Sequence, residues 1–104
     1  MTFTNEGLAK KLLILRKKSG LTQEEVAAHL NVNRSTYAYY ETADTTPSYN
    51  ILLSLCEFYG VSTDWFIMGK ARTEFEEQLN ADLLIVKGLD REGIYDMFRM
   101  SKLR

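Results

Sequence analysis

The stretch of sequence that decides the fold is residues 22–41, TQEEVAAHLNVNRSTYAYYE. Thr22 is a favourable helix N-cap, and Glu25 three residues later completes a capping box, in which each side chain accepts a hydrogen bond from the other residue's backbone N–H. Apolar residues then recur at helical spacing, at Val26, Ala27 and Leu30. This pattern predicts a short amphipathic helix that buries one face.

A second short helix is predicted directly after the first. Residues 31–33, Asn-Val-Asn, interrupt the helical pattern, and Asn33 is a natural N-cap for a helix from Arg34 to Glu41. The small gap forces the two helices to cross at a steep angle. Two short helices joined in this way form a helix-turn-helix.

A longer amphipathic helix is predicted upstream, over residues 6–18. Its leucines recur at spacings of four and three residues, at Leu8, Leu12 and Leu15. The lysines of this segment lie on the other side, and Ser19-Gly20 ends the helix. We therefore expect one apolar face and one solvated face.

Two further helices are predicted after the helix-turn-helix. Pro47 opens the first of them, because proline is favoured in the first turn of a helix, and Gly60 ends it. Ser62 caps the second, and Gly69 closes it. The apolar residues of these two helices are Leu52, Leu55, Cys56, Tyr59, Trp65 and Phe66. No alternating run suggests a strand, so residues 1–69 are predicted to form an all-α domain of five helices.

Residues 70–104 are predicted to form a C-terminal helical hairpin. Gly88 ends the first helix of the hairpin, and Asp90 caps the second. Their apolar stripes consist of Phe75, Leu79, Leu83 and Val86, then Ile94, Met97 and Phe98. Two apolar faces that follow a complete domain need a partner. We expect them to join two copies of the chain in a homodimer, and the alternative is that they fold back on the first domain.

Length and composition limit the possible classes of protein. The 104 residues fit one compact domain, or one small domain with an oligomerising appendage, and the 45% apolar content is enough for a core. No run approaches the roughly 18 apolar residues that span a bilayer, and the start MTFTNEG does not resemble a signal peptide. We therefore expect a cytoplasmic protein without a membrane partner. Cys56 is the sole cysteine, in an apolar setting, so we expect it to pack in the core.

The charge is not that of a strongly basic nucleic-acid binder. The formal net charge is −1, and the isoelectric point is near 5.8. Residues 1–50 carry six basic and five acidic side chains, whereas residues 51–104 carry seven basic and nine acidic ones. A protein touches DNA with one face only, so this distribution allows DNA binding of modest affinity and ordinary salt sensitivity.

Catalysis is not indicated by any group of residues. His29 is the sole histidine, on the expected outer face of its helix, and no serine or cysteine is placed to form a nucleophile pair with it. No cysteine and histidine cluster has metal-ligand spacing, and no glycine-rich phosphate loop occurs. We therefore predict that the chain is not an enzyme and needs no cofactor.

The chain resembles the phage repressor and Cro family of regulators, also called the XRE family. The resemblance rests on LTQEEVAAHLNVNRSTYAYYE, on Pro47 and the apolar stripe that follows it, and on GVSTDWFIMG at residues 60–69. It covers about half of the chain strongly, and about two thirds with the first helix. It implies a lambda-repressor-like fold and a dimeric transcriptional regulator, by expectation a repressor, that binds a pseudo-palindromic operator in double-stranded DNA.

The resemblance also implies which residues read the bases. In the family the helix that begins at the position of Arg34 lies in the major groove, where base edges present a full donor and acceptor code. By position, the base-reading residues are Arg34, Ser35, Thr36, Ala38 and Tyr39. Arg34 could donate in a fork to guanine O6 and N7, and the alternative is a solvent-exposed arginine at a helix start.

Other positions are implied to hold the DNA backbone or the fold. The expected backbone contacts are Thr22, Gln23, Asn33, Tyr40, Thr42, Thr45 and Thr46. Gln23 matches a glutamine that bonds a phosphate and braces the first residue of the recognition helix. Arg16 and Glu41 match an arginine and a glutamate that commonly form a structural ion pair. The loop after the helix that ends at Glu41 departs from the family pattern. Relatives often have glycine and basic residues there, whereas this chain has Ala43 and Asp44. Asp44 would repel a phosphate if it faced the DNA.

Two other functions compete with that of a simple regulator. An antitoxin would bind operator DNA with its helix-turn-helix and a partner protein with another surface, and the C-terminal apolar helices suit that role equally well. A helix-turn-helix that has lost DNA binding and serves only as a scaffold is also compatible with the acidic isoelectric point.

Overall fold

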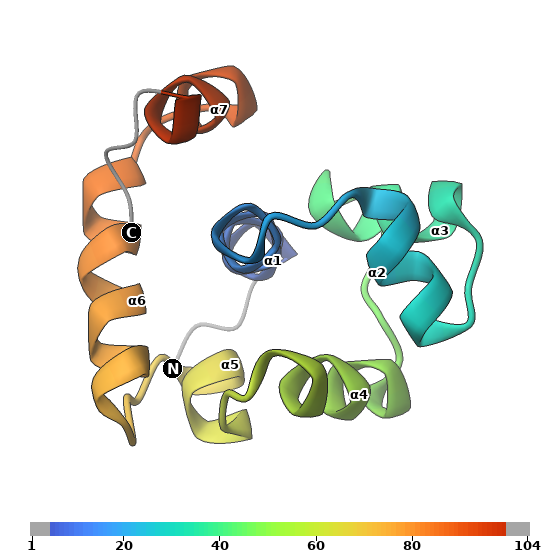
Figure 1. The fold of residues 1–104 in the computed structure, drawn as a ribbon. Coiled ribbons are helices and arrows are strands. Elements are labelled where there is room, and N and C mark those ends of the chain that lie inside the picture. Colours follow the sequence, from blue (N-terminus) through green and yellow to red (C-terminus); the bar gives the residue numbers. More distant parts are fainter. Residues whose placement is uncertain (1–4, 100–104) are drawn as a thin grey trace.

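The computed structural model describes residues 5–99, which form helices and no strand (Figure 1). The helices are α1 (Asn5–Ser19), α2 (Gln23–Leu30), α3 (Arg34–Glu41), α4 (Tyr49–Tyr59), α5 (Thr63–Met68), α6 (Glu74–Val86) and α7 (Arg91–Arg99). The predicted all-α class is therefore confirmed. None of these helices is both long and apolar enough to cross a membrane.

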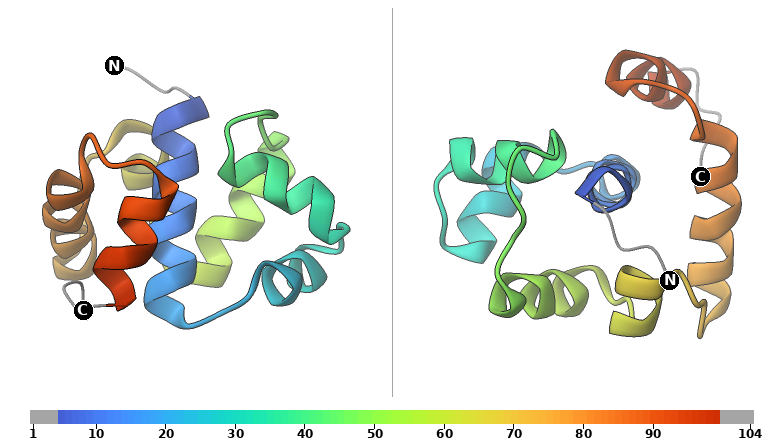
Figure 2. Two further views of the ribbon diagram at one scale, coloured as in Figure 1. Left: turned by 90° about the horizontal axis from the view of Figure 1, so that it is seen from above. Right: turned by 180° about the vertical axis from the view of Figure 1, so that it is seen from behind.

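Helix α1 runs through the middle of the molecule. Figures 1 and 2 show α2 and α3 on one side of it, α4 and α5 along a second side, and α6 on the side opposite α2. Because other helices surround it, α1 buries more than the predicted stripe: Leu13 and Ile14 are each 1% exposed, and Leu8, Leu12 and Leu15 are also buried. The expectation of one apolar face was too narrow.

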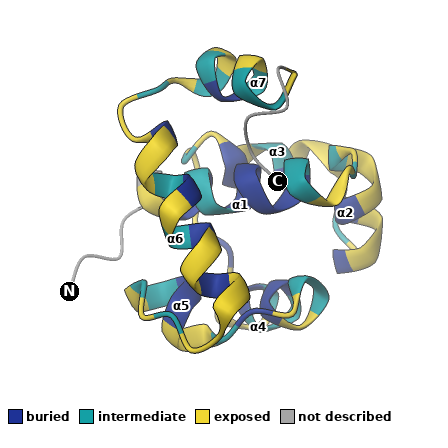
Figure 3. Cartoon of the chain, turned by 60° about the vertical axis from the view of Figure 1, so that its left-hand side comes forward, coloured by how far each residue is buried: buried dark blue, intermediate teal, exposed yellow. Residues whose placement is uncertain are grey.

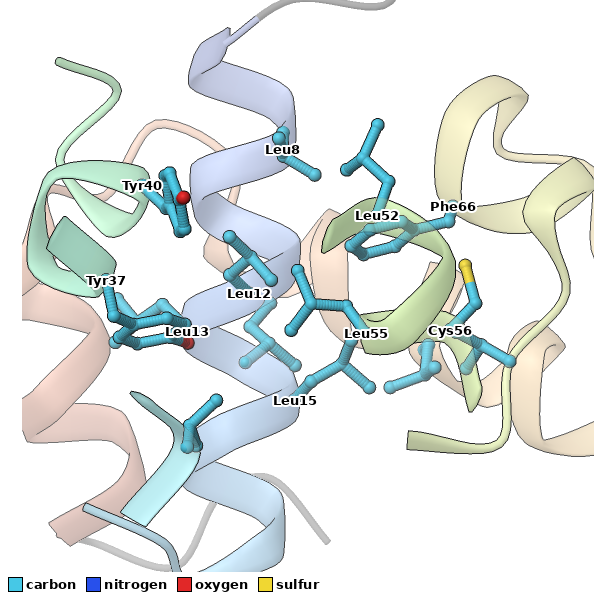
Figure 4. Packing of buried hydrophobic residues seen from close by; sticks show 14 of the residues in the cluster. Leu8, Leu12, Leu13, Leu15, Tyr37, Tyr40, Leu52, Leu55, Cys56 and Phe66 are labelled. Carbon is cyan, nitrogen blue, oxygen red and sulfur yellow. The ribbon is translucent and has the colours of Figure 1, made fainter. Parts of the chain in front are cut away.

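The core forms around the leucines of α1. Figure 4 shows Tyr37 from α3 on one side of them and Leu55 and Cys56 from α4 on the other. All three side chains are buried. Burial raises the pKa of the Cys56 thiol to about 11, which keeps the thiol neutral and agrees with its predicted packing role.

Helix starts follow the capping residues that the sequence predicts, with one exception. Thr22, Asn33 and Ser62 each accept a hydrogen bond from a backbone N–H in the first turn of α2, α3 and α5. Helix α4 starts at Tyr49, not at Pro47, because the Ser48 hydroxyl caps it, accepting from the backbone N–H of Ile51 at 3.3 Å. Pro47 precedes the cap as a buried residue.

The C-terminal helices pack against the rest of the molecule in this structure. Leu79 and Val86 of α6 and Ile94 of α7 are at most 1% exposed and belong to the same buried cluster as the α1 leucines. An ion pair of 2.8 Å between Lys18 and Asp82 joins α1 to α6. Within a single chain, the apolar faces of α6 and α7 are therefore covered because these helices fold back on the first domain, which is the alternative arrangement that the sequence left open. A domain boundary between residues 69 and 70 remains a prediction.

Helix α6 differs from its predicted stripe at Phe75. This side chain is 43% exposed, whereas the neighbouring Glu76 is 1% exposed. The Glu76 carboxylate accepts from the backbone N–H groups of Ser62 at 2.6 Å and Arg72 at 2.7 Å. A buried carboxylate needs such donors, and the start of α5 and the connection after it supply them. Figure 3 shows the alternation of buried and exposed residues along α6.

Trp65 of α5 links this helix to α1 and α6. Its indole Nε1 donates to Asn80 Oδ1 of α6 at 2.8 Å, and the Lys11 ammonium of α1 lies 5.0 Å from the ring centroid. The same ammonium donates to the carbonyl groups of Trp65 and Phe66 at 3.1 and 2.9 Å. Burial lowers the pKa of Lys11. Helix α5 is thus held from both sides.

Candidate nucleic-acid interface

Helix α3 has one buried and one outward face. Tyr37, Tyr40 and Glu41 are at most 7% exposed, so both tyrosines pack in the core. Arg34, Ser35, Ala38 and Tyr39, at relative positions 0, 1, 4 and 5, share the outward face. Of these, Ala38 is half-buried, and Tyr39 is 52% exposed. Thr36, the fifth predicted base-reading residue, is half-buried at the edge of this face.

The guanidinium of Arg34 is held by α2. Its Nη1 donates to Gln23 Oε1 at 3.1 Å. The other end of the Gln23 amide, Nε2, donates to Glu41 Oε1 at 3.1 Å. Gln23 therefore connects the start of α3 with its end, which restricts where the exposed Arg34 side chain points.

Glu41 is the centre of a buried polar network. Its carboxylate accepts from Arg16 through two bonds, Nε to Oε2 at 2.6 Å and Nη2 to Oε1 at 3.0 Å. The Tyr37 hydroxyl donates to Oε2 at 2.7 Å. The structure thus pairs Arg16 with Glu41 as the family resemblance implied. The bidentate geometry fixes α3 to α1 with directional bonds rather than apolar contact alone.

The environment of Glu41 keeps it ionised. Burial alone would raise the pKa of this carboxyl, but hydrogen bonds from Arg16 and Tyr37, and the Arg16 charge, hold the pKa below its ordinary value. Burial and the Glu41 charge in turn raise the pKa of Tyr37, which therefore stays protonated as a donor. The network has a single protonation state at neutral pH.

Arg91 of α7 joins this network, and no sequence pattern indicated that it would. Its Nη1 donates to the backbone carbonyl of Glu41 at 3.0 Å, and its Nη2 lies 3.4 Å from Glu41 Oε1. The same Nη2 donates to the Tyr95 hydroxyl at 2.7 Å. Arg91 and Glu41 are 50 residues apart in the sequence. No local pattern can indicate their contact, because it depends on where α7 docks.

The N-terminal ends of α2 and α3 are already capped by side chains. The Thr22 backbone N–H donates to Glu25 Oε1 at 2.9 Å, which completes the predicted capping box. At α3, Asn33 Oδ1 accepts from the Thr36 backbone N–H at 2.9 Å and the Ser35 hydroxyl at 3.0 Å. Thr22 and Asn33 are exposed, as DNA backbone contacts require, but the Glu25 carboxylate beside Thr22 weakens its attraction for phosphate.

The loop after α3 presents its three threonines to solvent. Thr42, Thr45 and Thr46 are exposed, and the Thr42 hydroxyl donates to Asp44 Oδ2 at 2.6 Å. Ala43 has a φ of +68°, the left-handed conformation that glycine adopts most readily. Asp44 is exposed in the same loop, so its negative charge lies at the surface predicted to follow the DNA backbone.

An open pocket of about 700 Å³ lies between α7 and the helix-turn-helix. Its lining includes Gln23 and Arg34 from the helix-turn-helix, Lys17 from α1, and Tyr95 from α7. The Lys17 ammonium lies 4.1 Å from the Tyr95 ring centroid, a cation–π contact that holds it beside the pocket. Lys17 therefore brings a positive charge to the side of the helix-turn-helix, whereas its neighbour Lys18 pairs with Asp82.

Comparisons with known proteins agree on the class of this chain. Residues 4–66 match the sequence model of a helix-turn-helix family. The chain is 38% identical over 77 residues to the HTH-type transcriptional regulator ImmR of Bacillus subtilis (strain 168), a match that covers 74% of this chain and 58% of that protein. It is 30% identical over 90 residues to the cryptic phage CTXphi transcriptional repressor RstR of Vibrio cholerae, which covers 86% of this chain and 80% of the repressor.

A solved structure supports the same assignment. A transcriptional regulator from Listeria innocua aligns with a TM-score of 0.57 and 26% identity, over 91% of this chain and 89% of that one. The chain spans less than two thirds of the length of the Bacillus relative, and most of the length of the other two proteins. The family match includes α1 to α4 and most of α5. The chain belongs to the phage repressor and Cro-like (XRE) family of helix-turn-helix transcriptional regulators.

Proposed function

We propose that the chain represses transcription by binding a pseudo-palindromic operator as a homodimer, with α3 in the major groove. The observation that carries this proposal is the outward face of α3, with Arg34 held by Gln23 at its leading end. A helix of this kind fits the width of the major groove, and its early residues meet the base edges. The relative named as a transcriptional regulator supports control of transcription, and the relative named as a repressor supports repression.

Arg34 is the proposed reader of one guanine. Its Nη1 is bonded to Gln23, which leaves the remaining guanidinium donors for O6 and N7 of the base. Ser35, Thr36, Ala38 and Tyr39 complete the base-reading face. Gln23, Thr22, Asn33, Tyr40 and the three loop threonines would contact the sugar-phosphate backbone and set the register.

The outer face of α6 is the proposed dimer contact. The core-facing residues Leu79 and Val86 are covered within the chain, so a second copy must use another face. Leu84 is 72% and Ile85 is 51% exposed, and Ala81 lies beside them on the outward side. A two-fold axis through such a patch would relate two recognition helices by symmetry, as a pseudo-palindromic operator requires.

Selection of bound sequences from a random DNA pool tests the function. The expected result is a two-fold related site that the chain prefers over unrelated DNA. Arg34→Ala should cost about 1 to 3 kcal/mol of binding free energy and relax preference at one base pair in each half-site. Arg72→Ala is the matched control, because Arg72 is an exposed arginine whose side chain pairs with Asp64 at 3.6 Å. An unchanged preference in Arg34→Ala would contradict the assignment.

Sedimentation equilibrium tests the dimer. Leu84→Ser should convert the dimer to a monomer at concentrations where the parent chain is dimeric, without unfolding it, because Leu84 is already exposed. Phe75→Ser is the matched control, since this residue is exposed at the other end of α6. A parent chain that stays monomeric on its selected DNA, or equal association of both variants, would contradict a contact through this face.

A further inference from the structure

The C-terminal helix contacts the end of the recognition helix through one side chain. Arg91 opens α7, and its guanidinium bonds both the backbone carbonyl and the carboxylate of Glu41, the last residue of α3. The Tyr95 hydroxyl, one helical turn further along α7, accepts from Arg91 at 2.7 Å and fixes its orientation. A cation at the carbonyl end of a helix is also favoured by the helix dipole.

Further hydrogen bonds connect this contact to Arg34, the side chain proposed to read DNA. Glu41 Oε1, which lies 3.4 Å from Arg91 Nη2, accepts from Gln23 Nε2 at 3.1 Å. Gln23 Oε1 accepts in turn from Arg34 at 3.1 Å. A continuous path of hydrogen bonds therefore runs from α7, outside the residues matched by the family model, to the leading end of α3.

We propose that Arg91 is a positioning residue for DNA binding, which sets the Arg34 side chain through Glu41 and Gln23. The proposal rests on the proposed function, because it assigns Arg34 to base reading. Arg91 itself does not touch the bases. Its effect is to hold Glu41 in the place from which Gln23 can orient the Arg34 guanidinium toward one base pair.

Loss of Arg91 leaves the fold with its other supports. Glu41 keeps both bonds from Arg16 and the bond from the Tyr37 hydroxyl, so the carboxylate remains paired. The Arg91 side chain is 34% exposed, so its removal opens no sealed cavity. Arg91→Ala therefore allows the positioning effect to be measured in a folded protein.

Binding to the selected DNA site gives the first test. Arg91→Ala should weaken binding about three- to tenfold, and it should relax preference at the same base pair as Arg34→Ala. Arg91→Lys retains the charge and a donor and should recover most of the loss. Arg99→Ala is the matched control, because Arg99 lies on the same helix and pairs with Asp96 at the surface.

A double-mutant cycle separates positioning from simple charge. If Arg91 acts through Gln23, Arg91→Ala should cause little further loss in a Gln23→Ala background. A charge acting directly on phosphates would instead add its full loss and reduce the salt dependence of binding. Additive losses, or a loss without any change of base preference, would overturn the proposal.

A measurement without DNA distinguishes failure of this proposal from failure of the proposed function. In Arg91→Ala the side-chain amide NMR signals of Gln23 should shift, because Glu41 Oε1 then has fewer donors. The control Arg99→Ala should leave them in place. Unshifted signals would overturn the positioning path whatever the chain binds. Shifted signals in a chain that selects no DNA would overturn the role in DNA binding and retain the contact path.

Discussion

At the scale of single residues, Glu41 determines how the recognition helix is held. Its buried carboxylate accepts hydrogen bonds from Arg16, Gln23, Tyr37 and Arg91, which belong to four different helices, α1, α2, α3 and α7. Removing Arg16, the bidentate partner, would leave the buried charge without its main compensation, whereas the intact pair is fully hydrogen-bonded. The network therefore specifies the place of α3 more than it adds to the overall stability.

Stability should fall in acid because of Glu41. Its folded pKa lies below the unfolded value of 4.5, so its contribution is present above that pH and is lost as pH falls through the folded pKa. Urea unfolding from neutral pH down to about pH 3 should show this loss. Tyr37→Phe removes one donor and should raise the pH at which the Glu41 carboxyl signal titrates. A carboxyl that titrates above its ordinary value would contradict the network.

The same network shows what sequence reasoning can and cannot find at this scale. The pairing of Arg16 with Glu41 follows from the family resemblance, and Gln23 was placed beside Arg34 on the same ground. Arg91 has no such precedent in the pattern, because residues that meet across 50 positions are joined by helix docking alone. The base and phosphate contacts themselves remain predictions.

At the scale of the elements, capping residues determine where helices begin. Thr22 and Asn33 could be identified from the sequence, because their side chains accept hydrogen bonds from N–H groups that have no partner within the first turn of a helix. Pro47 misled the assignment of α4, because Ser48 directly after it offers the stronger cap. Phe75 misled the assignment of α6, because apolar periodicity carries no information on where the partner helices end.

The loop after α3 contains a position where glycine should be better than the native residue. Ala43 has a φ of +68°, so Ala43→Gly should stabilise the fold by about 1 kcal/mol. Ala28→Gly is the matched control, because Ala28 is an exposed residue of α2, and its change should cost about 1 kcal/mol. Urea unfolding of both variants measures the difference. Equal destabilisation by both would contradict the strain assigned to Ala43.

At the scale of the whole molecule, the helix-turn-helix and the C-terminal helices share one core. Buried residues of α6 and α7 lie in the same cluster as those of α1 to α5. The sequence indicated the apolar faces of these helices correctly at Leu79, Val86 and Ile94. It left two partners open, the chain itself and a second copy, because periodicity identifies a face but not what covers it.

A core substitution in α6 should therefore destabilise the recognition helix as well. Leu79 is fully buried, and Leu79→Ala should cost about 2 to 5 kcal/mol of unfolding free energy. Amide hydrogen exchange in α3 and α6 should accelerate together in one cooperative unit. Met68→Ala, at an exposed residue, should change the free energy by less than about 0.5 kcal/mol. Faster exchange confined to α6 and α7 would show that they unfold separately.

The setting of Trp65 gives the chain a natural optical probe. It is the sole tryptophan, 1% exposed, and its indole N–H is bonded to Asn80 of α6. Fluorescence of an indole moves to longer wavelengths when water reaches it. Tryptophan emission from the unlabelled protein should therefore show, during DNA addition, whether α6 stays packed against α5. A shift to longer wavelengths would mean that the two helices separate.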